Sequence, residues 1–237
     1  MLKEPANPTT RRTLVRVAIL AVILGILTLV ALGWASRWRP DRTEFPLQGV
    51  LLTDKNGTIH WGRLKATGAD FAYLEATDGA KVRARNFLTN RQGARTSGMR
   101  YGALHNYSLC ELATAQAANF DTLVPRDSDA LPPAVRIAYT DSCNSSEGTT
   151  QAMFESELTT FLNQIETHMG RRAILMPSPD VASDYSFAEL KRPLWLTRRF
   201  RAPEEGTIWR MWQASTRARV DGTDGQVSWN VINNKND

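Results

Sequence analysis

Four carboxylates stand near the ends of segments that the sequence predicts to be strands of one sheet: Asp54, Glu75, Asp78 and Asp141. Carboxyl groups can act as general acids and bases, and different surroundings can separate the pKa values of two of them. Solvated loop carboxylates are the competing interpretation for each of the four. Because Asp54 and Asp141 both lie in predicted loops, their use in chemistry requires that the loops reach back to the strand ends.

The segment Leu131–Ala138 is a predicted buried strand that begins after the rigid turn Pro132-Pro133. A barrel enzyme would be expected to place catalytic carboxylates at the end of such a strand. Here the positions hold Arg136, which is permanently charged, and Ala138, which has no functional group. If the strands of Glu75 and Arg136 are neighbours, the two side chains form an ion pair on the floor of a cleft.

The two cysteines of the chain, Cys110 and Cys143, are candidates for one disulfide. A disulfide is favoured outside the cytoplasm, and two buried free thiols remain the alternative. The sequence has no CxxC pattern, and its three histidines are scattered. It therefore predicts neither a metal site nor a cofactor.

The first 45 residues do not have the pattern of a folded domain. Residues 17–35 carry no charge, and at about 1.5 Å per residue they span the hydrocarbon core of a bilayer. Basic residues precede this stretch and tryptophans lie at its far end, as is typical of a membrane anchor: Arg11, Arg12 and Arg16, then Trp34 and Trp38. The sequence thus divides into a tail over 1–16, a transmembrane helix over 17–35, a linker over 36–45 and a domain over 46–237.

A cleaved signal peptide is the alternative for this stretch, with Gly33 and Ala35 near the cleavage site, but its apolar core would be unusually long. We expect a single-pass protein of the inner membrane, with its N-terminus in the cytoplasm and its C-terminal domain in the periplasm or outside the cell. The formal net charge is only +5, and the sequence has no basic stripe with interleaved aromatic residues. Nucleic acid is therefore not an expected partner.

Strands and helices alternate through the domain, which predicts a parallel α/β architecture. Short late strands without helices between them favour an irregular barrel. The predicted strands lie over residues 49–53, 71–76, 99–107, 135–139, 173–176, 194–197, 209–214 and 227–231. The predicted helices lie over residues 61–66, 85–97 and 112–123, with a longer amphipathic one from about 154 to Gly170.

A series of segments stands out along the domain: Gly49-Val50-Leu51-Leu52-Thr53, Phe71-Ala72-Tyr73-Leu74-Glu75-Ala76-Thr77-Asp78-Gly79, Gln116-Ala117-Ala118-Asn119-Phe120, Leu131-Pro132-Pro133, Pro193-Leu194-Trp195-Leu196, Trp212-Gln213 and Val227-Ser228-Trp229-Asn230. In their order and spacing these segments make the domain similar to the family 25 glycoside hydrolases, lysozymes that cut the muramic acid linkage of peptidoglycan. The similarity runs from about Phe45 to Asn234. The resemblance implies an irregular α/β barrel with its cleft at the carboxyl ends of the strands.

The resemblance also implies four catalytic carboxylates. The family supplies one from the first strand, an Asp-x-Glu pair from the fourth and one near the C-terminus. In this chain the corresponding positions are Leu51, Arg136, Ala138 and Ser228. Glycoside hydrolysis needs a general acid and usually a second carboxylate, so the resemblance implies a catalytically degenerate member.

The family further implies that aromatic and basic side chains line the cleft and bind substrate: Tyr73, His105, Tyr107, Arg136, Trp195 and Trp212. Core packing is the alternative for the tryptophans.

Three candidate functions follow from the family resemblance and the missing carboxylates. The first is a membrane-anchored domain that binds peptidoglycan with impaired or absent hydrolysis. The second is an active muramidase with relocated acids, and the third is a module that binds another protein of the cell envelope.

Overall fold

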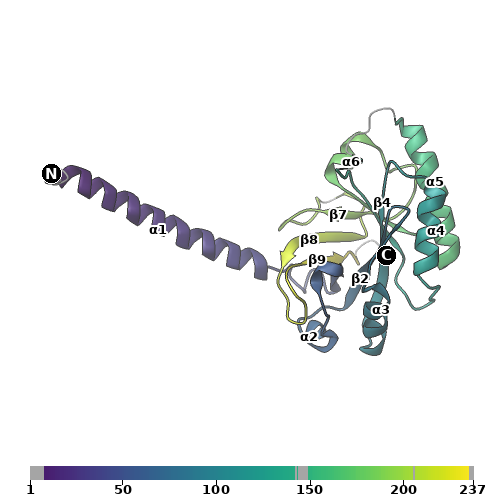
Figure 1. Ribbon diagram of the computed structural model, residues 1–237, viewed down its shortest axis with the longest axis horizontal. Helices are drawn as coiled ribbons and strands as arrows, with labels where there is room; N and C mark the ends of the chain where they lie inside the picture. Colours follow the sequence, from purple (N-terminus) through teal and green to yellow (C-terminus); the bar gives the residue numbers. More distant parts are fainter. Residues whose placement is uncertain (1–7, 142, 144–148, 205, 235–237) are drawn as a thin grey trace, which may run out of the picture. The chain divides into compact units, whose positions relative to one another are not determined.

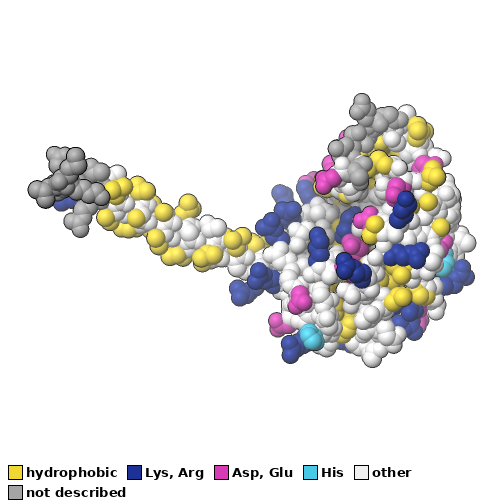
Figure 2. Space-filling view, in the orientation of Figure 1, with side chains coloured by type: hydrophobic (Ala, Val, Ile, Leu, Met, Phe, Trp, Pro, Cys, Tyr) yellow, Lys and Arg dark blue, Asp and Glu magenta, His cyan; other side chains and the backbone are white. Residues whose placement is uncertain are grey.

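The N-terminal part of the chain forms one apolar helix, α1 (Pro8–Arg37). The stretch Arg12–Arg37 reaches a mean hydropathy of 2.7, and the predicted span 17–35 lies inside it. Hydrophobic side chains cover most of its surface (Figure 2). The helix is long and apolar enough to cross a membrane, a property that it shares with signal sequences near an N-terminus.

A computed structural model describes residues 8–141, 143, 149–204 and 206–234. Its two compact units are Met1–Trp38, which contains α1, and Arg39–Asp237. The second unit contains the strands β1 (Gln48–Leu52), β2 (Phe71–Asp78), β3 (Val82–Arg83), β4 (Arg100–Tyr107), β5 (Ala134–Ile137), β6 (Ile174–Pro177), β7 (Trp195–Thr197), β8 (Met211–Ala218) and β9 (Val227–Ile232). Its helices are η1 (Asp54–Asn56), α2 (Trp61–Ala66), α3 (Phe87–Thr96), α4 (Ala113–Leu123), α5 (Gln151–Met169) and α6 (Pro179–Asp184).

The strands form one sheet in the order β6-β5-β4-β2-β1-β9-β8-β7, with β3 added to β2 (Figure 1). The two ends of this order meet through a parallel bridge between Leu175 and Leu194, which brings β6 to β7. The sheet is therefore a nearly closed barrel, as the sequence predicts. The expectation of a parallel sheet needs one main correction, because β9 runs antiparallel to both β1 and β8. No helix separates β8 from β9, so the chain turns back directly.

Two apolar cores lie on the two sides of the barrel wall, because successive strand side chains point to opposite faces. The inner core includes Leu51, Tyr73 and Trp195. The outer core packs the wall against the helices, and α4 and α5 lie side by side there (Figure 1). On each strand, the side that a residue faces determines whether it can reach the interior of the barrel.

The segment that enters the second unit is packed onto the barrel. Phe45 is buried, with its ring centroid 5.5 Å from that of Trp212. The Arg39 guanidinium lies 4.5 Å from the centroid of the Trp229 ring. Gln48 Nε2 donates hydrogen bonds to the Pro40 and Phe45 carbonyls. The structure thus assigns residues 39–45 of the predicted linker to the folded unit.

Candidate functional site at the carboxyl ends of the strands

A pocket of about 550 Å³ lies at the carboxyl ends of β2, β4 and β5. Active sites of α/β barrels lie at this end, because the loops that follow the strands converge there. The residues that line it are Asp78, Gly79, Lys81, Val82, Asn106, Tyr107, Ser108, Glu111, Arg136, Ala138 and Thr140. Charged groups of both signs therefore surround the pocket.

The structure divides the four positions of the expected carboxylates into two pairs. Arg136 and Ala138 both line the pocket. Leu51 and Ser228 face each other as direct partners in the β1–β9 ladder, and neither is among the described residues that line the pocket. The Leu51 side chain is only 2% exposed and belongs to the inner core. The side chain at this position thus packs within the barrel.

Arg136 is the centre of a polar network that crosses three strands. Its Nη1 donates to Asn106 Oδ1 at 3.0 Å and to Glu75 Oε2 at 3.5 Å. Asn106 Nδ2 in turn donates to Asp78 Oδ2 at 3.3 Å. The ion pair between Glu75 and Arg136 is formed, although β4 lies between their strands, so they are not on neighbouring strands as the sequence argument supposed. Asn106 on β4 fills the gap between them.

Burial lowers the pKa of the Arg136 guanidinium, while the negative charges of Glu75 and Asp78 act in the opposite direction. Arginine stays protonated in proteins in spite of such shifts, because its ordinary pKa lies far above neutral pH. The side chains of Arg136 and Glu75 are 27% and 25% exposed. A permanent positive charge therefore stands in the pocket where the resemblance implies a carboxylate.

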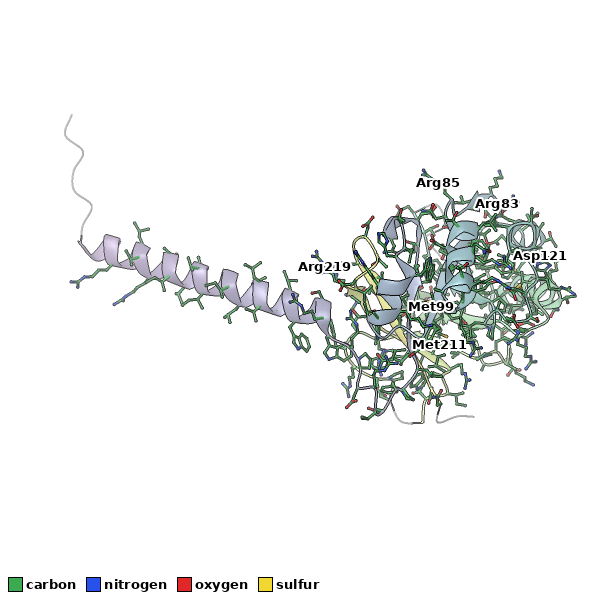
Figure 3. All side chains as sticks on the ribbon, turned by 90° about the horizontal axis from the view of Figure 1, so that it is seen from below. Arg83, Arg85, Met99, Asp121, Met211 and Arg219 are labelled. Atoms are coloured by element: carbon green, nitrogen blue, oxygen red, sulfur yellow. A yellow bond between two sulfur atoms is a disulfide. The ribbon has the colours of Figure 1, made fainter. Side chains whose placement is uncertain are left out.

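The four candidate relocated acids have different surroundings. Asp78 is exposed and lines the pocket, and Glu75 reaches it through Arg136. Asp54 accepts hydrogen bonds from the backbone amides of Arg85, at 2.8 Å, and of Asn86, at 3.0 Å. Figure 3 shows the Arg85 side chain at the surface of the folded unit. Asp54 thus holds the chain that leads into α3, and Asp141 is exposed in the turn after β5.

The aromatic side chains predicted to bind substrate are buried, and only Tyr107 among them lines the pocket. Tyr73 and Trp195 pack in the barrel interior with ring centroids 4.9 Å apart, and the Tyr73 hydroxyl donates to the Pro132 carbonyl. Trp212 Nε1 donates to the Arg198 carbonyl at 2.6 Å. In this structure these rings pack in the protein, which is the alternative that the sequence left open for the tryptophans, and their part in substrate binding stays a prediction.

His105 lies on the outer face of β4, because Asn106 takes the inward position next to it. Its ring stacks on Phe161 at 4.7 Å between centroids, and its nitrogens contact Thr77 Oγ1 at 2.8 Å and Gln116 Oε1 at 3.2 Å. Burial lowers the pKa of His105 to about 4, against a weaker opposite effect of Gln116. The imidazole is therefore neutral at pH 7 and belongs to the packing between sheet and helices.

Sequence reasoning missed Asn106, Lys81 and Glu111, which all contribute to the pocket. A polar residue between His105 and Tyr107 at the end of a strand was the available signal for Asn106. Glu111 accepts a hydrogen bond from the backbone amide of Ala80 at 2.6 Å and so fixes the turn after β2. That role depends on loop geometry, which no local sequence pattern indicates.

The disulfide Cys110–Cys143 is present, as the sequence predicts. It joins the loop after β4 to the turn after β5. Ser108, Glu111 and Thr140, which line the pocket, lie within three residues of one or the other cysteine. The disulfide therefore ties together two of the segments that form the pocket wall. Among the described residues, no group of three or more His, Cys, Asp or Glu side chains could hold a metal ion.

A nearly closed α/β barrel with its pocket at the carboxyl ends of the strands has the architecture of a barrel glycosidase. The profile of the glycosyl hydrolases family 25 matches residues 52–223, and the chain belongs to this family. The family resemblance seen in the sequence is thus confirmed.

Two curated relatives and one solved structure illustrate the similarity. Lysozyme M1 of Streptomyces globisporus is 25% identical over 199 residues, covering 79% of this chain and 68% of the relative. The uncharacterized protein YegX of Escherichia coli K12 is 24% identical over 202 residues, covering 80% and 71%. A family 25 glycosyl hydrolase from Bacillus anthracis has the same fold, with a TM-score of 0.73 and 24% identity, covering 85% of this chain and 94% of its own.

Proposed function

We propose that this chain is a membrane-anchored lysozyme-like domain of the cell envelope that binds peptidoglycan and has impaired or absent hydrolysis. Membership of family 25 supports the substrate class, as does the similarity to a protein named lysozyme. One observation supports the loss of catalysis most strongly. At the end of β5, Arg136 and Ala138 line the pocket where the resemblance implies an acidic pair.

The residues at the four expected catalytic positions are unsuited to glycoside cleavage. A carboxylic acid must protonate the leaving oxygen, and general acid catalysis is typically worth about 10²–10⁴-fold in rate. Ala138 has no proton to give. The transition state carries positive charge on the sugar, so the guanidinium of Arg136 would destabilise it. The acids expected at Leu51 and Ser228 are missing as well.

Hydrolysis by relocated acids is the alternative, and Asp78 and Glu75 are the acids nearest to the pocket. Glu75 accepts a hydrogen bond from Arg136, and Asp78 accepts one from Asn106. Neither carboxylate stands at a position where the family resemblance implies a catalytic acid. This arrangement favours binding over cleavage.

Two features, α1 and the disulfide, support the proposed location. The helix has the length and composition of a membrane anchor. The disulfide Cys110–Cys143 fits an oxidising compartment, because thiols stay reduced in the cytoplasm. These features support a cytoplasmic N-terminus, a single span in the inner membrane and a periplasmic barrel.

Pelleting with purified peptidoglycan tests the binding, and the turbidity of cell-wall suspensions tests the hydrolysis. The protein is expected to sediment with peptidoglycan and to leave the turbidity unchanged, while an active lysozyme of the same family clears the suspension. Clearing by this chain would establish the alternative of an active muramidase. Failure to sediment, with turbidity unchanged, would favour an envelope protein as the partner.

A further inference from the structure

The guanidinium of Arg136 has hydrogen-bond donors left over. Its Nη1 serves both Asn106 and Glu75. Among the described residues, Nε and Nη2 have no hydrogen-bond partner, although the side chain lines the pocket. The two free donors belong to one planar fork, which matches the two oxygens of a carboxylate. The pocket therefore offers a place for a carboxylate of a ligand.

The negative charge of Asp78 acts on the Arg136 guanidinium. Asp78 is exposed at the end of β2 and lines the same pocket. Asn106 Nδ2 donates a hydrogen bond to Asp78 Oδ2, and Asn106 Oδ1 accepts one from Arg136. Asn106 thus fixes the acidic group and the basic group at a set separation. Lys81, exposed on the same rim, adds a second positive charge.

The lining lacks an exposed aromatic face. Among the described residues, Tyr107 is the one aromatic side chain in the lining, and it is only 4% exposed. The tryptophans that could stack on sugar rings, Trp195 and Trp212, are 0% and 2% exposed. A ligand that offers charges of both signs suits this pocket better than a neutral sugar ring.

We infer that the pocket binds the stem peptide of peptidoglycan, with a peptide carboxylate on Arg136 and a free peptide amine on Asp78, in preference to the glycan strand. The inference rests on the proposed function and names the part of the polymer that is recognised. The pocket volume of about 550 Å³ lies within the range of small-ligand sites. Recognition through paired charges also needs no catalytic acid, in keeping with the residues present.

Isothermal titration calorimetry of the full chain in detergent micelles tests the inference with three probes. They are a disaccharide–tetrapeptide fragment of peptidoglycan, its peptide-free disaccharide, and the free tetrapeptide. We expect the two peptide-bearing probes to bind with similar affinity and the disaccharide to bind at least about tenfold more weakly. Equal affinity of the disaccharide and of the disaccharide–tetrapeptide would overturn the inference.

Two comparisons, each of a modified peptide with a protein variant, test the proposed contacts of the peptide with Arg136 and with Asp78. Amidation of the peptide carboxylates should weaken binding to the wild type about tenfold and have a smaller effect in Arg136→Lys, which keeps the charge but lacks the fork. Acetylation of the amine should weaken binding to the wild type and have no effect in Asp78→Asn. Arg199→Lys and Asp221→Asn change exposed residues outside the pocket lining and serve as matched controls. Equal losses in the variants and the controls would refute the assigned contacts.

The two proposals fail in different ways. If the protein sediments with intact peptidoglycan but the free tetrapeptide does not bind, the stem-peptide inference is wrong and the proposed function stands. If neither peptidoglycan nor any probe binds, both are wrong. Far-UV circular dichroism of each variant shows whether the barrel is intact.

Discussion

At the scale of single residues, Arg136 carries the largest consequence for function. It changes a site expected to hold negative charge into one that holds an ion pair bridged by an amide. The contact with Glu75 is long at 3.5 Å, whereas the contact with Asn106 is 3.0 Å. Asn106 therefore makes the shorter of the two side-chain contacts that hold the guanidinium.

The ion pair of Glu75 and Arg136 is expected to couple in a double-mutant cycle. Each single change to alanine leaves one charge in a partly desolvated site, so each should lower the free energy of unfolding by about 1–2 kcal/mol. The double variant should lose less than the sum by about 0.5–1 kcal/mol, since each side chain is about a quarter exposed and partly screened. Urea denaturation measures all four proteins, and strictly additive losses would exclude the coupling.

His105 predicts a pH dependence of stability. Its pKa in the folded protein is about 4, below the ordinary value of 6.5, so the unfolded chain binds a proton at higher pH than the folded chain does. The contribution is fully present above about pH 6.5 and is lost as the pH falls toward 4, to a total of about 3 kcal/mol. Urea midpoints between pH 7.5 and 4 should fall in the wild type and change less in His105→Gln. An equal pH dependence of the two proteins would contradict this account.

At this scale, sequence reasoning identified the residues better than it identified their surroundings. Arg136 and Ala138 could be placed at the end of a strand because Pro132-Pro133 fixes where that strand begins. His105 could not be assigned to a face, because a register change in the β2–β4 pairing between Glu75 and Thr77 lies beside it. The burial of Trp195 depends on closure of the barrel, which is a property of the whole sheet.

At the scale of elements, one disulfide joins two of the segments that line the pocket. The loop after β4 carries Ser108 and Glu111, and the turn after β5 carries Thr140. Cys110 and Cys143 close a segment with a sequence separation of 33. The disulfide restricts the unfolded chain and should therefore stabilise the fold. It also joins two segments of the pocket lining and should therefore affect ligand binding.

Replacing both cysteines by serine should lower the free energy of unfolding by about 2–4 kcal/mol, as expected for a loop of this length. Affinity for the tetrapeptide should also fall, since the two loops become free to separate. Chemical denaturation and calorimetry measure the two effects, and dithiothreitol should reproduce them in the wild type. Unchanged stability in the variant would show that the link is not structural.

Most elements of the barrel could be predicted because strand and helix patterns alternate clearly between Gln48 and Met169. The sequence did not indicate β3, which has only two residues, or α6, which is a helix of six residues. The antiparallel direction of β9 was missed because strand direction is set by the chain path, not by local pattern. Residues 39–45 were polar enough to predict a linker, although Phe45 fixes them to the barrel.

At the scale of the whole molecule, an apolar helix is followed within two residues by a folded barrel. The helix ends at Arg37 and the folded unit begins at Arg39. If α1 stays uncleaved in a membrane, the chain links the folded unit to that membrane.

Membrane attachment predicts a clear fractionation result. The full chain should stay in the membrane pellet after extraction with alkaline carbonate, because a helix of this length and hydropathy inserts stably. A chain that begins at Arg39 should appear in the soluble fraction. Recovery of a shortened soluble form would favour a cleaved signal sequence, and release of the full-length chain by carbonate would contradict a membrane anchor.

The central proposal is that the protein does not cleave peptidoglycan, because the expected catalytic carboxylates are replaced. Muropeptide analysis tests it by comparing the wild type with a variant that carries Leu51→Asp, Arg136→Asp, Ala138→Glu and Ser228→Asp, each incubated with purified peptidoglycan. The account predicts that the wild type releases no muropeptides and that the four-residue variant releases them. Release of muropeptides by the wild-type protein would contradict it.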